Sequence, residues 1–211
     1  MISMARDLKS ENRKFEIAFL LANLVVWFFF AYPEQIFSLS VESLFPDAAT
    51  TSFTALVVTI LVMILDGVVP ARLKEVIAFW KVTNAAPAHR AFSRFAIEDH
   101  RVDVEALENA IGPFPDVPSE QHSLWIRLLN KKRDDPAVLA SEKPYLLMRN
   151  LSVLALAILI AYPLMFIMTV ADWWLFFGYS SLLTIQFVVV SLSAQGYGNR
   201  FVGTVLHKAI V

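Results

Sequence analysis

Four apolar segments constrain what this chain can fold into more than any other feature of its sequence. They are Phe15–Tyr32, Ser52–Val69, Leu151–Val170 and Trp173–Ser193. Each has or approaches the roughly 20 apolar residues that a helix needs to cross a bilayer. The chain has 211 residues, of which 57% are hydrophobic, above the roughly 45–50% of soluble domains. The segments therefore predict four transmembrane helices.

The distribution of basic residues predicts the orientation of these helices. All 18 Lys and Arg residues lie in the N-terminal tail, in the segment between the second and third helices, or in the C-terminal tail. Because Lys and Arg favour the cytoplasmic side of a membrane, both termini and the middle segment are expected in the cytoplasm. Trp27, Tyr32, Trp173 and Trp174 then lie at the outer interface, which aromatic rings favour. We expect a multi-pass protein of a bacterial inner (plasma) membrane.

The predicted fold is an all-α integral membrane protein, with four transmembrane helices and a helical cytoplasmic domain between helices 2 and 3. Asp7 and Glu11, with no Ala-x-Ala site after the first apolar run, favour a retained span over a cleaved signal peptide. The expected divisions are a cytoplasmic tail (1–14), a first transmembrane hairpin (15–69), the cytoplasmic domain (70–150), a second hairpin (151–193) and an amphipathic tail helix (194–211).

Capping and breaking residues divide the cytoplasmic domain into helices. Leu73, Val76, Ile77 and Trp80 have helical spacing and continue the second span as an amphipathic helix. Further boundaries are predicted at Asp103 and Ser119 as N-caps, Gly112 as a helix end, Asp135-Pro136 as the start of a short helix, and Pro144 as the start of the helix that enters the third span. Trp80 and Trp125 are expected in the core, with partner anchoring as the alternative.

The C-terminal tail has a pattern of its own. The stretch "AQGYGNR" contains two glycines and predicts a hinge after the fourth span. After it comes an apolar stripe made of Phe201, Val202, Val205, Leu206, Ala209 and Ile210. Such a helix is expected to lie at the inner membrane surface or against the cytoplasmic domain.

Candidate catalytic chemistry is sparse. The absence of cysteine excludes disulfides, thiolate metal sites and cysteine nucleophiles. The sequence has no HExxH, GxSxG or phosphate-binding glycine loop, so we predict no catalytic residue, no metal and no cofactor. The open question is whether His100, Glu120 and His122 converge as a metal or acid–base site. With a net charge of −1 and interleaved charges, nucleic-acid binding is not expected.

Polar residues inside the apolar segments are candidates for a conduction path. Asp66 is the most informative, because an acid in a membrane is costly and suggests a cation or proton step. Pairing with Arg72 or Lys14 is the structural alternative. The other polar residues within these segments are Asn23, Thr59, Thr184 and Gln186. Side chains of these types commonly form hydrogen bonds between neighbouring transmembrane helices. If all four face one common axis, they would instead line a pore.

Four basic residues, Arg127, Lys131, Lys132 and Arg133, form a possible patch for anionic lipid or an anionic ligand. The size, the span number and the cytoplasmic middle domain together resemble the small four-span membrane effector proteins of bacterial antiphage defence systems. That resemblance implies disruption of the inner membrane after a signal from a cytoplasmic protein or a nucleotide.

Three functions remain open on these grounds. The first is a non-enzymatic effector or channel-like protein whose cytoplasmic domain senses a signal and acts on the spans. The second is a membrane anchor or scaffold that recruits a soluble partner, and the third is a membrane-embedded metal-dependent enzyme. Beyond the lipid bilayer, the expected partners are further copies of the chain or the other subunits of a membrane complex.

Overall fold

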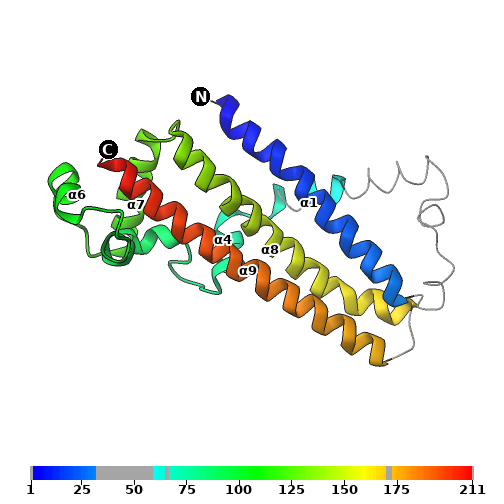
Figure 1. Cartoon of the computed structure of the whole chain (residues 1–211). Coiled ribbons are helices and arrows are strands. Elements are labelled where there is room, and N and C mark those ends of the chain that lie inside the picture. Colours follow the sequence, from blue (N-terminus) through cyan, green and yellow to red (C-terminus); the bar gives the residue numbers. More distant parts are fainter. Residues whose placement is uncertain (1, 32–58, 65–66, 170–172, 211) are drawn as a thin grey trace. The chain divides into compact units, whose positions relative to one another are not determined.

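The computed structural model describes residues 2–31, 59–64, 67–169 and 173–210 (Figure 1). Throughout these ranges the regular structure is helical, as predicted, and no strand occurs. The labelled elements are α1 (Ile2–Ala31), α4 (Ala71–Phe79), the 3-10 helix η2 (Pro87–Arg90), the π-helix η3 (Ala91–Phe95), α5 (Ala96–Glu98), α6 (Val104–Ile111), α7 (Pro118–Lys131), α8 (Pro136–Thr169) and α9 (Trp173–Ala209).

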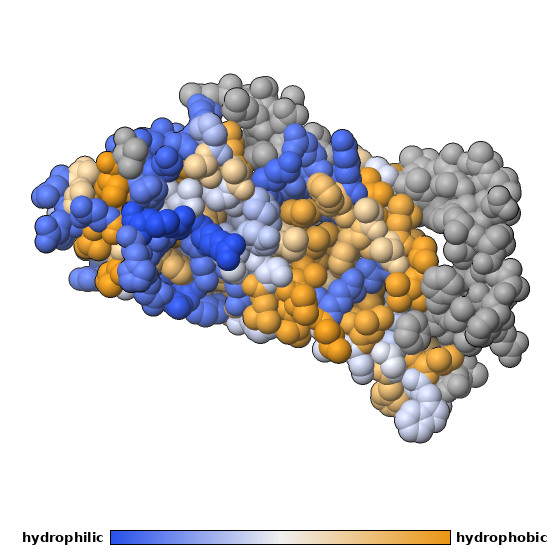
Figure 2. All heavy atoms as spheres, viewed as in Figure 1, coloured by the Kyte–Doolittle hydropathy of each residue, from blue (hydrophilic) through white to orange (hydrophobic). Residues whose placement is uncertain are grey.

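Two helices in the described ranges are long and apolar enough to cross a membrane. They are Pro136–Pro163, with 28 residues, and Trp173–Ala209, with 37 residues. Many apolar side chains of α9 face outward, including Ile185 with 61% and Trp174 with 87% of its surface exposed. Figure 2 shows hydrophobic residues gathered over the stretches of α8 and α9 that Figure 1 draws in yellow and orange, whereas hydrophilic residues cover much of α6 and α7. Water would disfavour such apolar exposure, whereas lipid accommodates it.

The chain divides into two compact units. Unit 1 comprises Met1–Pro70 and Asn150–Val190, and unit 2 comprises Ala71–Arg149 and Ser191–Val211. In unit 1, α1 packs with parts of α8 and α9 around a cluster of Tyr162, Phe166, Tyr179 and Leu183. The rings of Tyr162 and Tyr179 meet edge to face with centroids 4.7 Å apart, a geometry that the charge distribution of aromatic rings favours.

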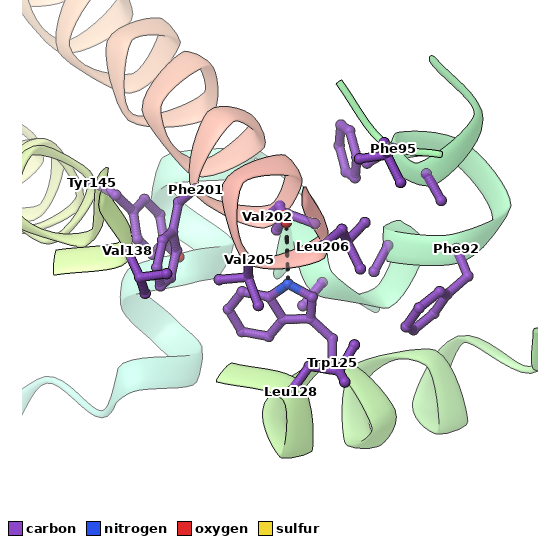
Figure 3. Close-up of a cluster of buried hydrophobic side chains, with 14 of the residues drawn as sticks. Phe92, Phe95, Trp125, Leu128, Val138, Tyr145, Phe201, Val202, Val205 and Leu206 are labelled. Carbon is purple, nitrogen blue, oxygen red and sulfur yellow. Dashed lines mark hydrogen bonds between the residues drawn. The ribbon is translucent and has the colours of Figure 1, made fainter. Parts of the chain in front are cut away.

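Unit 2 has a larger core in which α9 is central (Figure 3). The Trp125 ring of α7 lies edge-on to Phe201 with centroids 5.3 Å apart, and its Nε1 donates a hydrogen bond of 3.4 Å to the carbonyl oxygen of Val202. Val205 and Leu206 are fully buried beside them. The C-terminal stripe therefore packs against the domain of residues 71–149, one of its two predicted locations, and Trp125 is a core residue as predicted.

The predicted breaks at Pro144 and at the glycines are wrong. α8 begins at Pro136 and continues through Pro144 as one helix of 34 residues. Asp135 caps it, because its Oδ1 accepts a hydrogen bond of 2.8 Å from the Ala137 amide. The buried side chains of Val138 and Tyr145 anchor α8 on both sides of Pro144, which favours helix despite the hydrogen bond that proline cannot donate.

Likewise, α9 passes through Gly196 and Gly198 without a hinge. A Cβ atom at Gly198 would lie 2.8 Å from Phe79 Cζ and 3.0 Å from Tyr145 Cε2, whereas one at Gly196 would meet nothing within 4 Å. Gly198 therefore serves close packing in unit 2 rather than flexibility.

The predicted caps have a mixed outcome. Asp103 caps α6 by accepting a hydrogen bond of 3.0 Å from the Ala106 amide, and Gly112 ends that helix with φ of +88°. Ser119 is not a cap, because α7 already begins at Pro118, whose ring fixes a helical φ. Trp80 does not belong to the core, since half of its surface, 50%, is exposed.

Candidate functional site

A buried glutamine organises the most irregular segment of unit 2. Gln121 on α7 is 1% exposed. Its Oε1 accepts hydrogen bonds of 3.2 Å from the amides of Phe92 and Ser93 and from the Ser93 hydroxyl. These residues belong to the π-helix η3, a rare conformation that often occurs at functional sites. Ser93 is thus bound to an amide oxygen rather than to a base that would activate it as a nucleophile.

Two histidines stack beside this glutamine. The rings of His89 and His122 have centroids 4.5 Å apart and planes within 20° of parallel. His89 Nδ1 lies 3.0 Å from the Pro118 carbonyl oxygen and so acts as the donor. His122 Nδ1 is buried without a hydrogen-bond partner. Burial, with a smaller effect of His89, lowers the pKa of His122, so this ring is neutral at pH 7.

The sequence left open whether His100, Glu120 and His122 converge, and the structure does not group them at one site. His122 packs on His89, His100 is exposed in the turn after α5, and Glu120 lines a hollow of about 390 Å³. Throughout the described ranges, no three His, Asp or Glu side chains are grouped to bind a metal ion. Because a nitrogen lone pair lies in the plane of its ring, stacked parallel rings do not converge on one ion between them.

An ion pair connects α4 to α8 within unit 2. Arg149 Nη1 lies 3.7 Å from Glu75 Oε1, and the two side chains are 15% and 22% exposed. Burial raises the pKa of Glu75, and the charges of Arg149 and His89 oppose this shift. The guanidinium of Arg149 also lies 5.5 Å from the centre of the Tyr145 ring, within the range of cation–π attraction.

A second polar group connects α9 to the turn after α5. Arg101 donates hydrogen bonds of 2.9 and 2.7 Å to the two carboxylate oxygens of Asp99. These hydrogen bonds lower the pKa of Asp99. His207 of α9 lies with Nδ1 2.6 Å from the Arg101 carbonyl oxygen. The end of α9 is therefore held by polar contacts as well as by its apolar stripe.

The predicted basic patch lies at the C-terminal part of α7 and in the turn after it. Arg127, Lys131 and Arg133 are exposed, and Lys132 is half-buried. Only Arg127 of these four also lines the hollow beside Glu120. The patch is thus accessible to an anionic ligand, at the edge of a hollow made mainly by α7 and the prolines that precede it.

The polar candidates within the apolar segments have different surroundings. Asn23 is 8% exposed in unit 1, where its Nδ2 donates to the Phe19 carbonyl oxygen at 2.9 Å. Tyr179 donates to the Asn23 carbonyl oxygen at 3.2 Å and so joins α9 to α1. The side chain of Asn23 therefore bonds within α1, and the connection to α9 uses only its backbone carbonyl oxygen. Thr59 and Gln186 are half-buried, Thr184 is exposed, and Asp66 lies outside the described residues.

One polar pair between two helices of unit 1 was not predicted. Asn150 Nδ2 of α8 donates a hydrogen bond of 2.8 Å to Oε1 of Glu16 on α1, and Glu16 is 5% exposed. Glu16 lies near the start of the first apolar segment, and an acidic residue at that position was the signal in the sequence that could have predicted this pair.

In comparisons with known proteins, no protein-family model, no curated protein and no solved structure matches the chain.

Proposed function

We propose that this chain is a non-enzymatic membrane effector, in which a cytoplasmic helical domain senses a signal and acts on transmembrane helices. One observation carries the proposal. The two helices able to cross a membrane, α8 and α9, also supply core residues of unit 2, such as Tyr145 and Phe201, whose rings stack with centroids 5.8 Å apart. Each helix is continuous, so a displacement of its cytoplasmic end is transmitted along its length.

Contacts inside unit 2 provide the route by which a ligand would act on α9. Trp125 joins α7 to Val202, and His207 joins the turn after α5 to α9. Gln195 Nε2 donates a hydrogen bond of 3.0 Å to the Ala78 carbonyl oxygen and joins α9 to α4. A signal that moves α7 or α4 therefore shifts the packing of α9.

The proposed protein has four spans in a bacterial inner membrane, with both termini and unit 2 in the cytoplasm. It works as a homo-oligomer or as a subunit of a membrane complex, because four spans are few for a conducting path. The resemblance to antiphage effectors makes phage infection the first trigger to test. The basic patch of Arg127, Lys131, Lys132 and Arg133 is the proposed receptor surface for an anionic signal.

The membrane potential of expressing cells tests the effector function. Cells that carry the chain and a potential-sensitive dye are followed before and after phage infection. We expect depolarisation that an inactive truncation without α9 does not produce. Asp66→Asn is expected to reduce the depolarisation if Asp66 is part of the conducting path, whereas Asp116→Asn, in an exposed link of unit 2, is expected to leave it unchanged.

A chain that inserts in the membrane yet never depolarises cells, with or without phage, contradicts the effector function and leaves the anchor or scaffold. Topology is tested separately. Because the chain has no cysteine, single cysteines in residues 1–14, 33–51, 70–150 and 194–211 can be labelled from either side of the membrane. Labelling of residues 33–51 from the cytoplasmic side would contradict the four-span arrangement.

A further inference from the structure

Helix α4 contributes Ala78 and Phe79 to the core of unit 2 but leaves part of its apolar surface outside that core. Its buried residues are Lys74, Ala78 and Phe79. Leu73 and Trp80, by contrast, are 45% and 50% exposed. Leu73, Val76 and Ile77 have the spacing of one helical face, and Trp80 follows directly after the end of α4. Val76 and Ile77 are half-buried, so the exposed apolar surface lies at the two ends of this stretch.

The chain continues the apolar exposure beyond α4. Val82 is 76% exposed, and Lys81 before it is exposed as well. Trp80 has φ of +55°, in the left-handed region that is costly for a bulky side chain, at about 1–2 kcal/mol. Folding thus maintains a strained backbone at the residue that presents an indole on the surface. Such strain is typical of positions with a functional role.

The place of α4 in the chain limits what can cover this face. α4 begins at Ala71, close after Val68, which is 72% exposed. The five residue-to-residue steps from Val68 to Leu73 extend at most about 18 Å. Along the helix, Trp80 follows Leu73 by about 10 Å. The face therefore begins next to the second apolar segment, whatever the arrangement of the two units.

We infer that the apolar face of α4, together with Val82, lies in the headgroup region of the cytoplasmic leaflet. An indole favours this depth of a bilayer because its ring is apolar and its N–H is polar. Arg72 and Lys81, both exposed, flank the face in sequence and reach lipid phosphates while their stems remain in apolar surroundings. Helices that lie in this manner bury one apolar face at the boundary between headgroups and acyl chains.

This inference rests on the proposed function, since it requires the segment before α4 to span the membrane. Lipid is the occupant that chain continuity favours over a soluble protein, because the face starts within a few residues of the span. A second copy of the chain or a soluble partner would instead shield the face from both lipid and water. The experiment below separates these cases.

Spin labels on single cysteines in the full-length chain measure the depth of this face. The chain has no native cysteine, so Leu73→Cys and Val82→Cys give unambiguous labels in vesicles of phosphatidylethanolamine and phosphatidylglycerol. Ile97→Cys serves as the aqueous control and Ile185→Cys as the lipid control, since these side chains are 65% and 61% exposed. Power saturation compares access of oxygen with access of a water-soluble nickel complex.

We expect the ratio of oxygen to nickel access to be severalfold higher at positions 73 and 82 than at position 97, and closer to the ratio at position 185. If positions 73 and 82 behave like position 97 while position 185 faces lipid, the interfacial helix is refuted, whereas α9 still lies in lipid as the proposed function requires. If the nickel complex also reaches position 185, both the interfacial helix and the proposed function are refuted. Exclusion of both reagents at positions 73 and 82 would assign the face to a protein contact and refute the lipid assignment.

Discussion

Replacement of Gly198 by alanine tests the packing of α9 in unit 2. The added methyl would lie 2.8 Å from Phe79 Cζ and 3.0 Å from Tyr145 Cε2, whereas nonbonded carbon atoms prefer about 3.5–4.0 Å. One ring or the helix must therefore move by several tenths of an ångström. Phe79 and Tyr145 are each 6% exposed and sit in a packed aromatic group, so neither has free space to enter.

The expected change in the free energy of unfolding follows from two opposed effects. Overpacking of a core costs about 1–3 kcal/mol. Alanine in a helix is favoured over glycine by roughly 0.8–1 kcal/mol. Gly196→Ala provides the matched control, because it gains the same helix preference and its Cβ meets nothing within 4 Å. The difference between the two variants removes the helix term and leaves the packing cost, about 1–3 kcal/mol, with Gly198→Ala the less stable.

Thermal unfolding of the full chain in detergent micelles, followed by near-UV circular dichroism, measures this difference. For a chain of this size, 1 kcal/mol corresponds to about 2–4 °C in the midpoint. Phe79→Leu in the Gly198→Ala background removes the closest ring atoms and is expected to recover part of the loss, which a double-mutant cycle quantifies. Equal midpoints for Gly196→Ala and Gly198→Ala would refute the close approach of α9 to Phe79 and Tyr145.

Three further predictions concern unit 2. Gly203→Ala is expected to destabilise the chain less than Gly198→Ala in the same assay. The three atoms nearest to its Cβ belong to the Asp99 carboxylate and the Arg101 guanidinium, which are the ends of side chains and can rotate away. An equal or larger loss would contradict this. Gln121→Leu leaves the Phe92 and Ser93 amides without their acceptor and is expected to lower the free energy of unfolding by roughly 2 kcal/mol or more. The control Asn130→Leu, at an exposed position of α7, should change the unfolding midpoint little. Equal effects of the two variants would refute the role of Gln121 as a buried acceptor. The lowered pKa of His122 means that the unfolded chain binds the proton more readily, so the stability from this group is complete above the ordinary pKa of 6.5 and declines as pH falls below it. Unfolding midpoints measured between about pH 7.5 and 5 should therefore fall less in His122→Phe than in the parent or in His100→Gln. Parallel curves for the three proteins would contradict this assignment.

Local sequence signals predicted the parts of the fold that depend on local physics. Asp103, Gly112 and Asp135 act where the backbone has unpaired groups or needs a positive φ, and these needs are visible in a few consecutive residues. The apolar stripe around Val205 was also recognisable, because burial of one helix face imposes its period on the sequence.

The site itself depends on contacts between distant residues, and these have no local signal. Gln121 stands between Glu120 and His122 in a polar stretch, and its burial follows from the amides of a π-helix 28 and 29 positions away. His122 stacks on His89 rather than joining His100 for the same reason. Tertiary contacts also explain why Pro144 lies inside a helix, since the core fixes α8 on both sides of it.

The close packing at Gly198 could nevertheless have been predicted from the sequence. It precedes Phe201, Val202 and Val205 by three, four and seven positions, so it lies on the apolar stripe itself. A glycine in phase with a buried face indicates close approach of a neighbour, whereas one out of phase, such as Gly196, carries no such implication.

Helix α9 runs without a break from Trp173 to Ala209. Each residue turns a helix by about 100°, and seven residues complete nearly two full turns. One alanine inserted at the boundary of Val190 and Ser191 therefore rotates Val205 out of register with Ile185, whereas seven inserted residues nearly restore the register at the cost of length. If the chain is the effector proposed above, its response to a signal should therefore depend on the rotation that an insertion causes rather than on the number of residues inserted.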